Sequence, residues 1–317
     1  MPSSITHFLF AKSVLNNLKQ SLPFINGDDY QNIVFVGAQG PDPLFFYGQI
    51  PFLKRPRKKE IQQVGSFLHD HKMDQKFIDM IDYANNQEGN QRNVLFSYIF
   101  GAMLHYCLDR VAHPFVFYRS GFKINEDDQT NYEVHHAMYE SYIDALMQLN
   151  FGTNFKSKKV VKANKTMMSL VSVMYAENEK LDRRDFYVAW KDMCMCEKIL
   201  NDKMGIKRFI LKKLHKDSSL QYAMIQPKKN DLKIDFLNLN RKEYLNPQSL
   251  EKHEHSFIEL FNIALNDSKN VVKIIKKAYN KEDVGEDIVN FCKKITYSGT
   301  LEGSKMQKFE SVFLNNK

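Results

Sequence analysis

The sequence feature that most constrains the fold is a run of ligand-type side chains inside an apolar segment. His105, Asp109 and His113 recur at every fourth residue. On an α-helix each step of four residues turns about 40° past a full circle, so the three side chains project from nearly one face. Burying two imidazoles and a carboxylate is costly unless something satisfies them, and a divalent cation does so directly. The same segment is crowded with apolar residues: Ile99, Met103, Leu104, Leu108 and Val111.

A second pair of ligand-type residues follows further along the chain. His136 and Glu140 lie one helical turn apart, again on one face. The neighbouring His135 has the wrong spacing to Glu140 for a shared face, so we expect it to be exposed. Five nitrogen and oxygen ligands on two helices exceed the four positions of one tetrahedral zinc ion. The sequence therefore predicts at least two metal ions, against the alternative of a hydrogen-bonded network in the core.

Helical periodicity dominates the chain and predicts an all-α fold. One short run, residues 33–37, is typical of a strand instead. We expect a compact multi-helix bundle that forms one domain over residues 1–317, in which residues 1–155 carry the metal site and residues 156–317 complete the bundle. Apolar residues recur at steps of three and four in seven segments: 9–18, 77–83, 94–111, 134–149, 160–175, 186–200 and 257–279.

The connections between these helices follow from the turn-forming and polar residues. Loops are expected at 37–51, 119–130 and 230–247. Ser3 or Ser4 is expected to cap the first helix, with His7 facing inward, and Ser249 to cap the helix after the third loop. Four cysteines are present, and their placement predicts no structural disulfide.

The order of candidate ligands resembles that of the bacterial zinc-dependent phospholipases C, which include the phosphatidylcholine-hydrolysing enzymes and the catalytic domain of clostridial alpha-toxin. The resemblance covers roughly the first half of the chain and implies the compact helical bundle of that family. It rests on eight residues in the family's order: His7, Asp42, His69, His105, Asp109, His113, His136 and Glu140.

The resemblance also implies a role for each of these residues. Asp42 would be the catalytic aspartate, and the other seven residues would hold two to three zinc ions. One ion would be bound by His69, His105 and Asp109. A second ion would be bound by His113, His136 and Glu140, and a third by His7, the shared Asp109 and the N-terminal residue. His71 competes with His69 for its position, and the pattern Leu68-His69 fits the family better.

The chain departs from the secreted members of that family at its start. Those members begin with a tryptophan that binds the third zinc, whereas this chain begins Met-Pro-Ser-Ser and its one tryptophan is Trp190. Removal of Met1 would expose the amine of Pro2, which we expect either to complete the third site or to leave it to water. No acidic residue precedes His7, so the choline-binding acid of the choline-preferring enzymes has no counterpart here.

The charge and hydropathy of the chain limit the kinds of partner that it can have. Lys plus Arg number 45 and Asp plus Glu 37, a formal excess of eight positive charges that suits anionic substrates. The sharpest basic run, residues 54–59, is expected to be a solvated loop or a contact for phosphate or lipid headgroups. Because neither a secretory signal nor a spanning segment is expected, a cytoplasmic location is predicted.

The chemistry implied is hydrolysis of a phosphodiester, with a glycerophospholipid as the first candidate substrate. Asp42 would orient or deprotonate the attacking water, and Asp109 would bridge two metal ions. Peripheral contact with an anionic membrane is expected, and a stable nucleic-acid partner is not. Two alternatives stay open: a single-strand-specific zinc nuclease, and a non-catalytic zinc-binding member. The cluster Phe45, Phe46 and Tyr47 would line the substrate pocket or belong to the core.

Overall fold

A computed structural model describes residues 4–18, 22–50, 53–202, 204–214, 216, 219–227 and 233–314. Within these residues the chain forms fourteen helices and one two-stranded antiparallel sheet, in which Tyr244 pairs with His253 and Leu245 with Lys252. The prediction of an all-α fold is confirmed. All seven segments with helical periodicity overlap helices of the structure.

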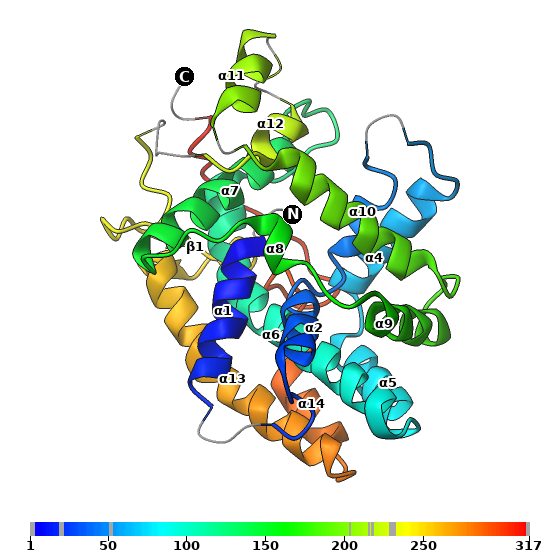
Figure 1. Ribbon diagram of the computed structural model, residues 1–317. Helices are drawn as coiled ribbons and strands as arrows, with labels where there is room; N and C mark the ends of the chain where they lie inside the picture. Colours follow the sequence, from blue (N-terminus) through cyan, green and yellow to red (C-terminus); the bar gives the residue numbers. More distant parts are fainter. Residues whose placement is uncertain are drawn as a thin grey trace.

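The elements follow one another along the chain, and Figure 1 shows how they are arranged. Their bounds are α1 Ser4–Asn16, α2 Asp28–Gly37, α3 Pro43–Phe46, α4 Lys58–Asp70, α5 Met73–Asn85, α6 Gly89–Ser120, α7 Tyr132–Asn150, α8 Ser157–Val160, α9 Lys165–Asn178, α10 Asp185–Leu200, α11 Ile206–Lys213, α12 Leu220–Met224, β1 Tyr244–Leu245, β2 Lys252–His253, α13 Phe257–Tyr279 and α14 Gly285–Cys292.

Helix α6 is the centre of the molecule, and α2 and α13 make extensive contact with it (Figure 1). It runs for 32 residues, and most of its side chains from Val94 onward are buried. Two glycines allow α2 to lie directly against α6. A Cβ at Gly37 would lie 2.3 Å from the carbonyl oxygen of Tyr98, and one at Gly101 would lie 2.2 Å from that of Val34. Any larger residue would therefore push the two helices apart.

Residues 33–37 are not a strand, and this prediction was wrong. They form the second half of α2, whose first turn carries Asp28 and Asp29 at the positive end of the helix dipole. Ile33, Val34 and Val36 are fully buried because α2 has neighbours on several sides, including α6 and α1. A short apolar run that is buried all round shows no helical period, so the pattern cannot separate the two structures.

Two predicted caps also differ from the structure. Ser249 lies in a turn, and α13 begins later, where Ser256 and Glu259 form a reciprocal capping box. At the start of α1 the backbone amides of Ile5 and Thr6 donate to the carboxylate of Asp144 in α7, at 3.2 and 2.8 Å. Ser4 is the first helical residue, and Ser3 lies outside the described residues. The cap thus comes from another helix, which ties α1 to α7.

The buried core contains residues from both halves of the chain, from Ile5 in α1 to Tyr297 near the C-terminal end. Helix α13 packs along α6, and the segment after α14 returns across the end of α6. There the amide of Glu310 donates to the carbonyl oxygen of Tyr118 at 2.9 Å. The cysteines Cys107, Cys194, Cys196 and Cys292 are free thiols. None of the described helices has the length and apolar composition that crossing a bilayer requires.

Candidate metal centre

Five segments bring the eight predicted site residues together at the core of the molecule. Helix α1 supplies His7, α4 supplies His69, and Asp42 lies directly before α3. Helix α6 supplies the row at every fourth residue, and α7 supplies the last pair. Seven of the eight are buried, and the His136 side chain is 14% exposed. The eight residues, called the metal centre below, are His7, Asp42, His69, His105, Asp109, His113, His136 and Glu140.

The first group of facing ligand atoms surrounds the Asp109 carboxylate. Nε2 of His7 lies 3.0 Å from Oδ1 of Asp109, and Nε2 of His105 lies 3.0 Å from its Oδ2. The rings of His7 and His105 are 4.2 Å apart between centroids. One ligand atom from each residue falls within 4.8 Å of the others, a spacing that one cation can fill.

The second group shares His105 with the first. Oδ1 of Asp42 lies 3.0 Å from Nε2 of His69 and 3.7 Å from Nε2 of His105. The resemblance implied a site formed by His69, His105 and Asp109, with Asp42 acting on water. In the structure the compact group contains Asp42 together with His69 and His105. Asp42 is therefore placed as a candidate ligand as well as a candidate acid.

The third group joins α6 to α7. Nε2 of His113 and Nε2 of His136 lie 3.4 and 3.3 Å from Oε1 of Glu140. Nδ1 of His113 is 3.7 Å from Oδ2 of Asp109, so this group adjoins the first. These are the three residues that the resemblance implied for one zinc ion.

Backbone carbonyls orient three of the imidazoles. Nδ1 of His69 faces the carbonyl oxygen of Gly65 at 2.7 Å, and Nδ1 of His105 faces that of Ala38 at 3.0 Å. Nδ1 of His113 lies 2.6 Å from the carbonyl oxygen of Tyr297. An N–H on Nδ1 that donates outward leaves the Nε2 lone pair directed inward, which is the arrangement of metal-binding histidines.

Several polar atoms of the centre lack hydrogen bonds. Among the described residues, Nδ1 of His7, Nδ1 of His136 and Oε2 of Glu140 are buried without a hydrogen-bond partner. Buried polar atoms are nearly always satisfied, so each of these atoms calls for an explanation. A divalent cation supplies one, because imidazole nitrogens and carboxylate oxygens are the ligands that zinc accepts. The residues present fit zinc.

The pKa values of the buried groups also indicate that the centre can bind a cation. Burial alone would raise the pKa of Asp109, but His105, His113 and His7 outweigh it and hold this pKa well below its usual range. The pKa of Glu140 is lowered in the same way, because His136 and His113 outweigh its burial. Burial lowers the pKa of His113, but Asp109 and Glu140 raise it to about 9. Without a cation, the protonated imidazole of His113 would balance part of the charge of the buried carboxylates.

A family model described as zinc-dependent phospholipase C matches residues 6–191. The chain belongs to this family. No curated protein and no solved structure gives a significant match. The matched span begins just before His7, contains the whole metal centre, and ends within α10.

The histidines that competed for places in the centre lie elsewhere. His71 is exposed and stacks on Phe67, with the ring centroids 4.7 Å apart. His135 is half-buried rather than exposed, because its ring packs against Phe313 at 5.0 Å. The C-terminal segment that covers it could not be anticipated from the helical pattern. Pro2 lies outside the described residues.

Tyr297 is a residue of this site that the sequence did not reveal. It is buried, and its ring lies 4.9 Å from that of His69 and 5.2 Å from that of His105. Its amide donates to the carbonyl oxygen of His69 at 3.1 Å, and its own carbonyl faces Nδ1 of His113. It thus holds two histidines from separate helices, yet it follows α14 and lies far beyond the matched family span.

A cavity of about 690 Å³ opens beside the metal centre, with His136 in its wall. Phe45 and Phe46 line it, whereas the buried Tyr47 belongs to the core. The rest of the wall combines aromatic and aliphatic side chains with polar ones: Phe117, Phe122, Tyr132, Ile199, Leu200, Leu220, Met224, Gln49, Gln62, Gln63, Gln221, Lys59, Lys123 and Glu133.

Proposed function

We propose that this protein is a zinc-dependent phosphodiester hydrolase that releases the phosphorylated headgroup of a glycerophospholipid. The observation that carries the proposal is the arrangement of three adjoining ligand groups next to a large, aromatic-walled cavity. Membership of the zinc-dependent phospholipase C family supports the same chemistry. The choice of a lipid as substrate rests on the cavity.

We propose that the metal centre holds two to three zinc ions through His7, Asp42, His69, His105, Asp109, His113, His136 and Glu140. Bound zinc supplies a water of lowered pKa and neutralises charge on the phosphate. Asp109 suits a bridging role because its two oxygens face different histidines at 3.0 Å. Asp42 is proposed to orient the attacking water and accept its proton, since its carboxylate lies between His69 and His105.

The cavity is proposed to hold the substrate next to the centre. Lys59 and Lys123 outnumber Glu133 and place net positive charge in a wall that combines aromatic and aliphatic side chains with polar ones. This combination suits a lipid, whose phosphate is anionic and whose glycerol and acyl parts are apolar. The side-chain amide of Gln62 donates to the carbonyl oxygen of Phe45 at 2.9 Å, which fixes the aromatic segment after Asp42.

One observation favours the nuclease as second candidate. Phe45, Phe117, Phe122 and Tyr132 present several aromatic rings in one cavity, and nucleobases stack on such rings. The excess of eight positive charges suits a single-stranded nucleic acid as well as a lipid. Both substrates contain a phosphodiester, so the metal centre serves either reaction.

The test is hydrolysis by the zinc-loaded protein of phosphatidylcholine, other glycerophospholipids and single-stranded DNA, each with and without chelator. The expected result is release of a phosphorylated headgroup that chelation abolishes, with no cleavage of DNA. Asp109→Asn is the control for contaminating enzymes. It removes the only carboxylate of the first ligand group, so any activity that remains in this variant comes from another enzyme. Chelator-sensitive cleavage of DNA alone would establish the nuclease instead. Zinc binding without hydrolysis of any of them would indicate a non-catalytic member.

A further inference from the structure

Helix α11 carries an apolar face that the rest of the described chain does not cover. None of the eight residues of α11, all of which the structure describes, is buried. Ile206 is 50% exposed, Phe209 58% and Ile210 48%, and Leu214, directly after the helix, is 60% exposed. So many large apolar side chains in water on one short helix mark an interaction surface.

The apolar residues share one face of α11. At about 100° per residue, Ile206, Phe209, Ile210 and Leu214 fall within an arc of about 140°. Arg208 projects from the opposite side and anchors the helix to the body of the protein. Its guanidinium donates to the carbonyl oxygen of Ile225 at 2.8 Å and lies over the ring of Tyr222 at 4.3 Å. The anchor therefore keeps the apolar face turned away from the core.

Basic side chains border this face. Lys207 and Lys212 flank the apolar arc, Lys213 lies within it, and all three are exposed. The Lys213 ammonium lies 5.0 Å from the centre of the Phe209 ring. No acidic residue occurs in the helix. Apolar side chains bordered by positive charge are the pattern of helices that lie in the interface of an anionic bilayer.

The basic run that the sequence singled out is engaged differently. The Arg55 guanidinium makes two hydrogen bonds of 2.6 Å to the carboxylate of Asp192. Arg57 pairs with Glu60 at 2.9 Å and with Asp185 at 3.0 Å. These arginines hold the loop against α10 and its N-terminal end. Because each one pairs with carboxylates, its positive charge is largely compensated. Lys212 and Lys213 lie on a helix that contains no acidic residue, whereas the ammonium of Lys207 donates to the carbonyl oxygens of Ile199 and Asn201.

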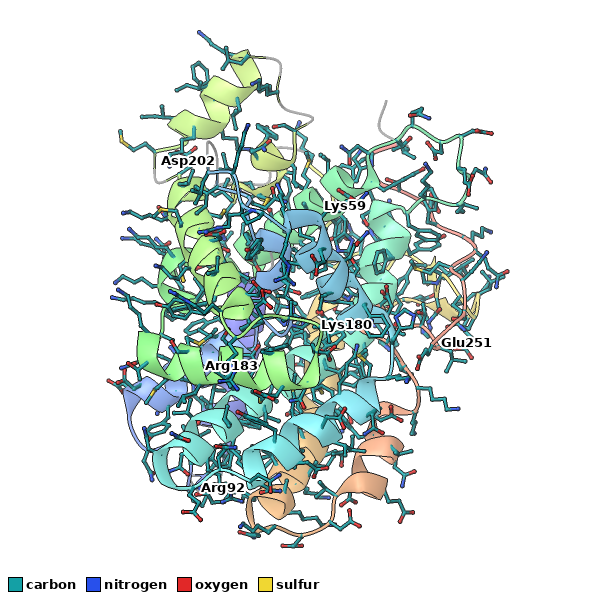
Figure 2. All side chains as sticks on the ribbon, turned by 90° about the vertical axis from the view of Figure 1, so that its right-hand side faces the viewer. Lys59, Arg92, Lys180, Arg183, Asp202 and Glu251 are labelled. Atoms are coloured by element: carbon teal, nitrogen blue, oxygen red, sulfur yellow. The ribbon has the colours of Figure 1, made fainter. Side chains whose placement is uncertain are left out.

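Helix α11 also lies beside the cavity of the metal centre. It connects α10 to α12, and both neighbours line the cavity: Ile199 and Leu200 at the end of α10, and Leu220 and Met224 in α12. Figure 1 shows α11 projecting from one end of the molecule next to α12. In Figure 2 it stands above Asp202, with its side chains extending into solvent.

We infer that α11 docks this protein on an anionic lipid bilayer, with Ile206, Phe209, Ile210 and Leu214 in the boundary between headgroups and acyl chains. Lys212 and Lys213 contact the anionic headgroups. Docking brings the cavity to the surface from which a phospholipid must be drawn, so the inference rests on the proposed function. Because the helix is short, binding is reversible and depends on both the apolar face and the charge.

The test is sedimentation of the zinc-loaded full-length protein with vesicles of phosphatidylcholine alone and with vesicles containing about one third phosphatidylserine. Phe209→Gln with Ile210→Gln, and separately Lys212→Glu with Lys213→Glu, are each expected to weaken binding to the anionic vesicles at least tenfold. High salt should weaken wild-type binding as well. All four side chains are exposed, so the variants should keep their fold.

Two matched controls remove the same chemistry elsewhere. Leu239→Gln with Ile263→Gln removes apolar side chains that are 61% and 44% exposed, and Lys269→Glu with Lys273→Glu reverses two exposed charges of α13. Both controls should bind anionic vesicles like wild type. Equal binding by the α11 variants and their controls would refute the inference. The inference would also be refuted if wild type forms a dimer and the α11 variants are monomers, because a second copy would then cover the apolar face.

A second measurement separates this inference from the proposed function. A short-chain phospholipid dissolved as monomers needs no docking, so the α11 variants should hydrolyse it at the wild-type rate. If wild type hydrolyses it but the α11 variants bind vesicles unchanged, the docking role alone is wrong. If wild type binds vesicles through α11 but hydrolyses no phospholipid, the proposed function fails while docking stands.

Discussion

Replacing Gly40 with alanine tests whether His105 belongs to the metal centre. Gly40 has a φ of +52°, and a Cβ there would lie 2.4 Å from Cδ2 of His105. Ordinary contact begins at 3.4 Å, so the ring or the loop must move by about 1 Å. Since His105 is common to two ligand groups, and a zinc–nitrogen bond tolerates only about 0.2 Å, we expect loss of zinc as well as stability.

The magnitude follows from two contributions. Alanine at positive φ costs about 1–2 kcal/mol, and forced overpacking a further 1–3 kcal/mol. Gly89 has the same φ of +52° with no atom within 4 Å of its Cβ position, so Gly89→Ala reports the backbone strain alone. At about 2 °C per kcal/mol, the packing clash alone should place the melting temperature of Gly40→Ala about 2–6 °C below that of Gly89→Ala, and the loss of zinc should lower it further.

The assays are thermal unfolding and elemental analysis of both variants after gel filtration. Gly89→Ala should keep the wild-type zinc content, whereas Gly40→Ala should lose at least one ion per chain. Equal melting temperatures and equal zinc contents in the two variants would refute the reasoning, because they would show that nothing depends on the contact between Gly40 and His105.

Three further predictions concern the centre as a whole. Chelation should lower the melting temperature by about 8 °C, because a ligand at a thousand times its Kd stabilises by about 4 kcal/mol; an unchanged melting curve would contradict this. Asp42→Asn should reduce hydrolysis about a hundredfold or more while retaining more zinc than Asp109→Asn, since Asp109 faces three histidines; residual activity above about a tenth would exclude Asp42 as the base. In metal-free protein the raised pKa of His113, about 9, contributes stability that is fully present below about pH 6.5 and lost as the pH rises through 9. Zinc requires neutral His113, so the melting temperatures of zinc-loaded and metal-free protein should diverge from pH 6.5 to 9, and a constant difference would count against this.

The sequence predicted those parts of the molecule that depend on local spacing. The row His105, Asp109 and His113 is set by helical geometry, and α6 places all three side chains toward the other ligands. His136 and Glu140 follow the same rule on α7. The compact group of Asp42, His69 and His105 depends instead on how α3, α4 and α6 pack, which no spacing within one segment contains.

A helix that is buried on several sides is also hard to predict from the pattern of apolar and polar residues. Residues 33–37 resemble a strand because α6 and α1 both cover them, and the apolar run has no polar face to reveal its period. Conversely, α11 has a strong helical pattern but is too short to stand out from a loop. Its meaning comes from its exposure, and exposure is a property of the fold.

The C-terminal half contributes to the centre through backbone groups, which explains why no motif marks it. The carbonyl oxygen of Tyr297 orients His113, and its amide binds the carbonyl oxygen of His69. Any residue except proline could supply these two groups, so the sequence carries no signature of them. The neighbouring Gly299 is more constrained. It has a φ of +71°, and a Cβ there would lie 2.5 Å from Pro114, directly after His113 in α6. The close approach of this segment to α6 thus requires glycine, and it places the Tyr297 carbonyl where the metal centre needs an acceptor.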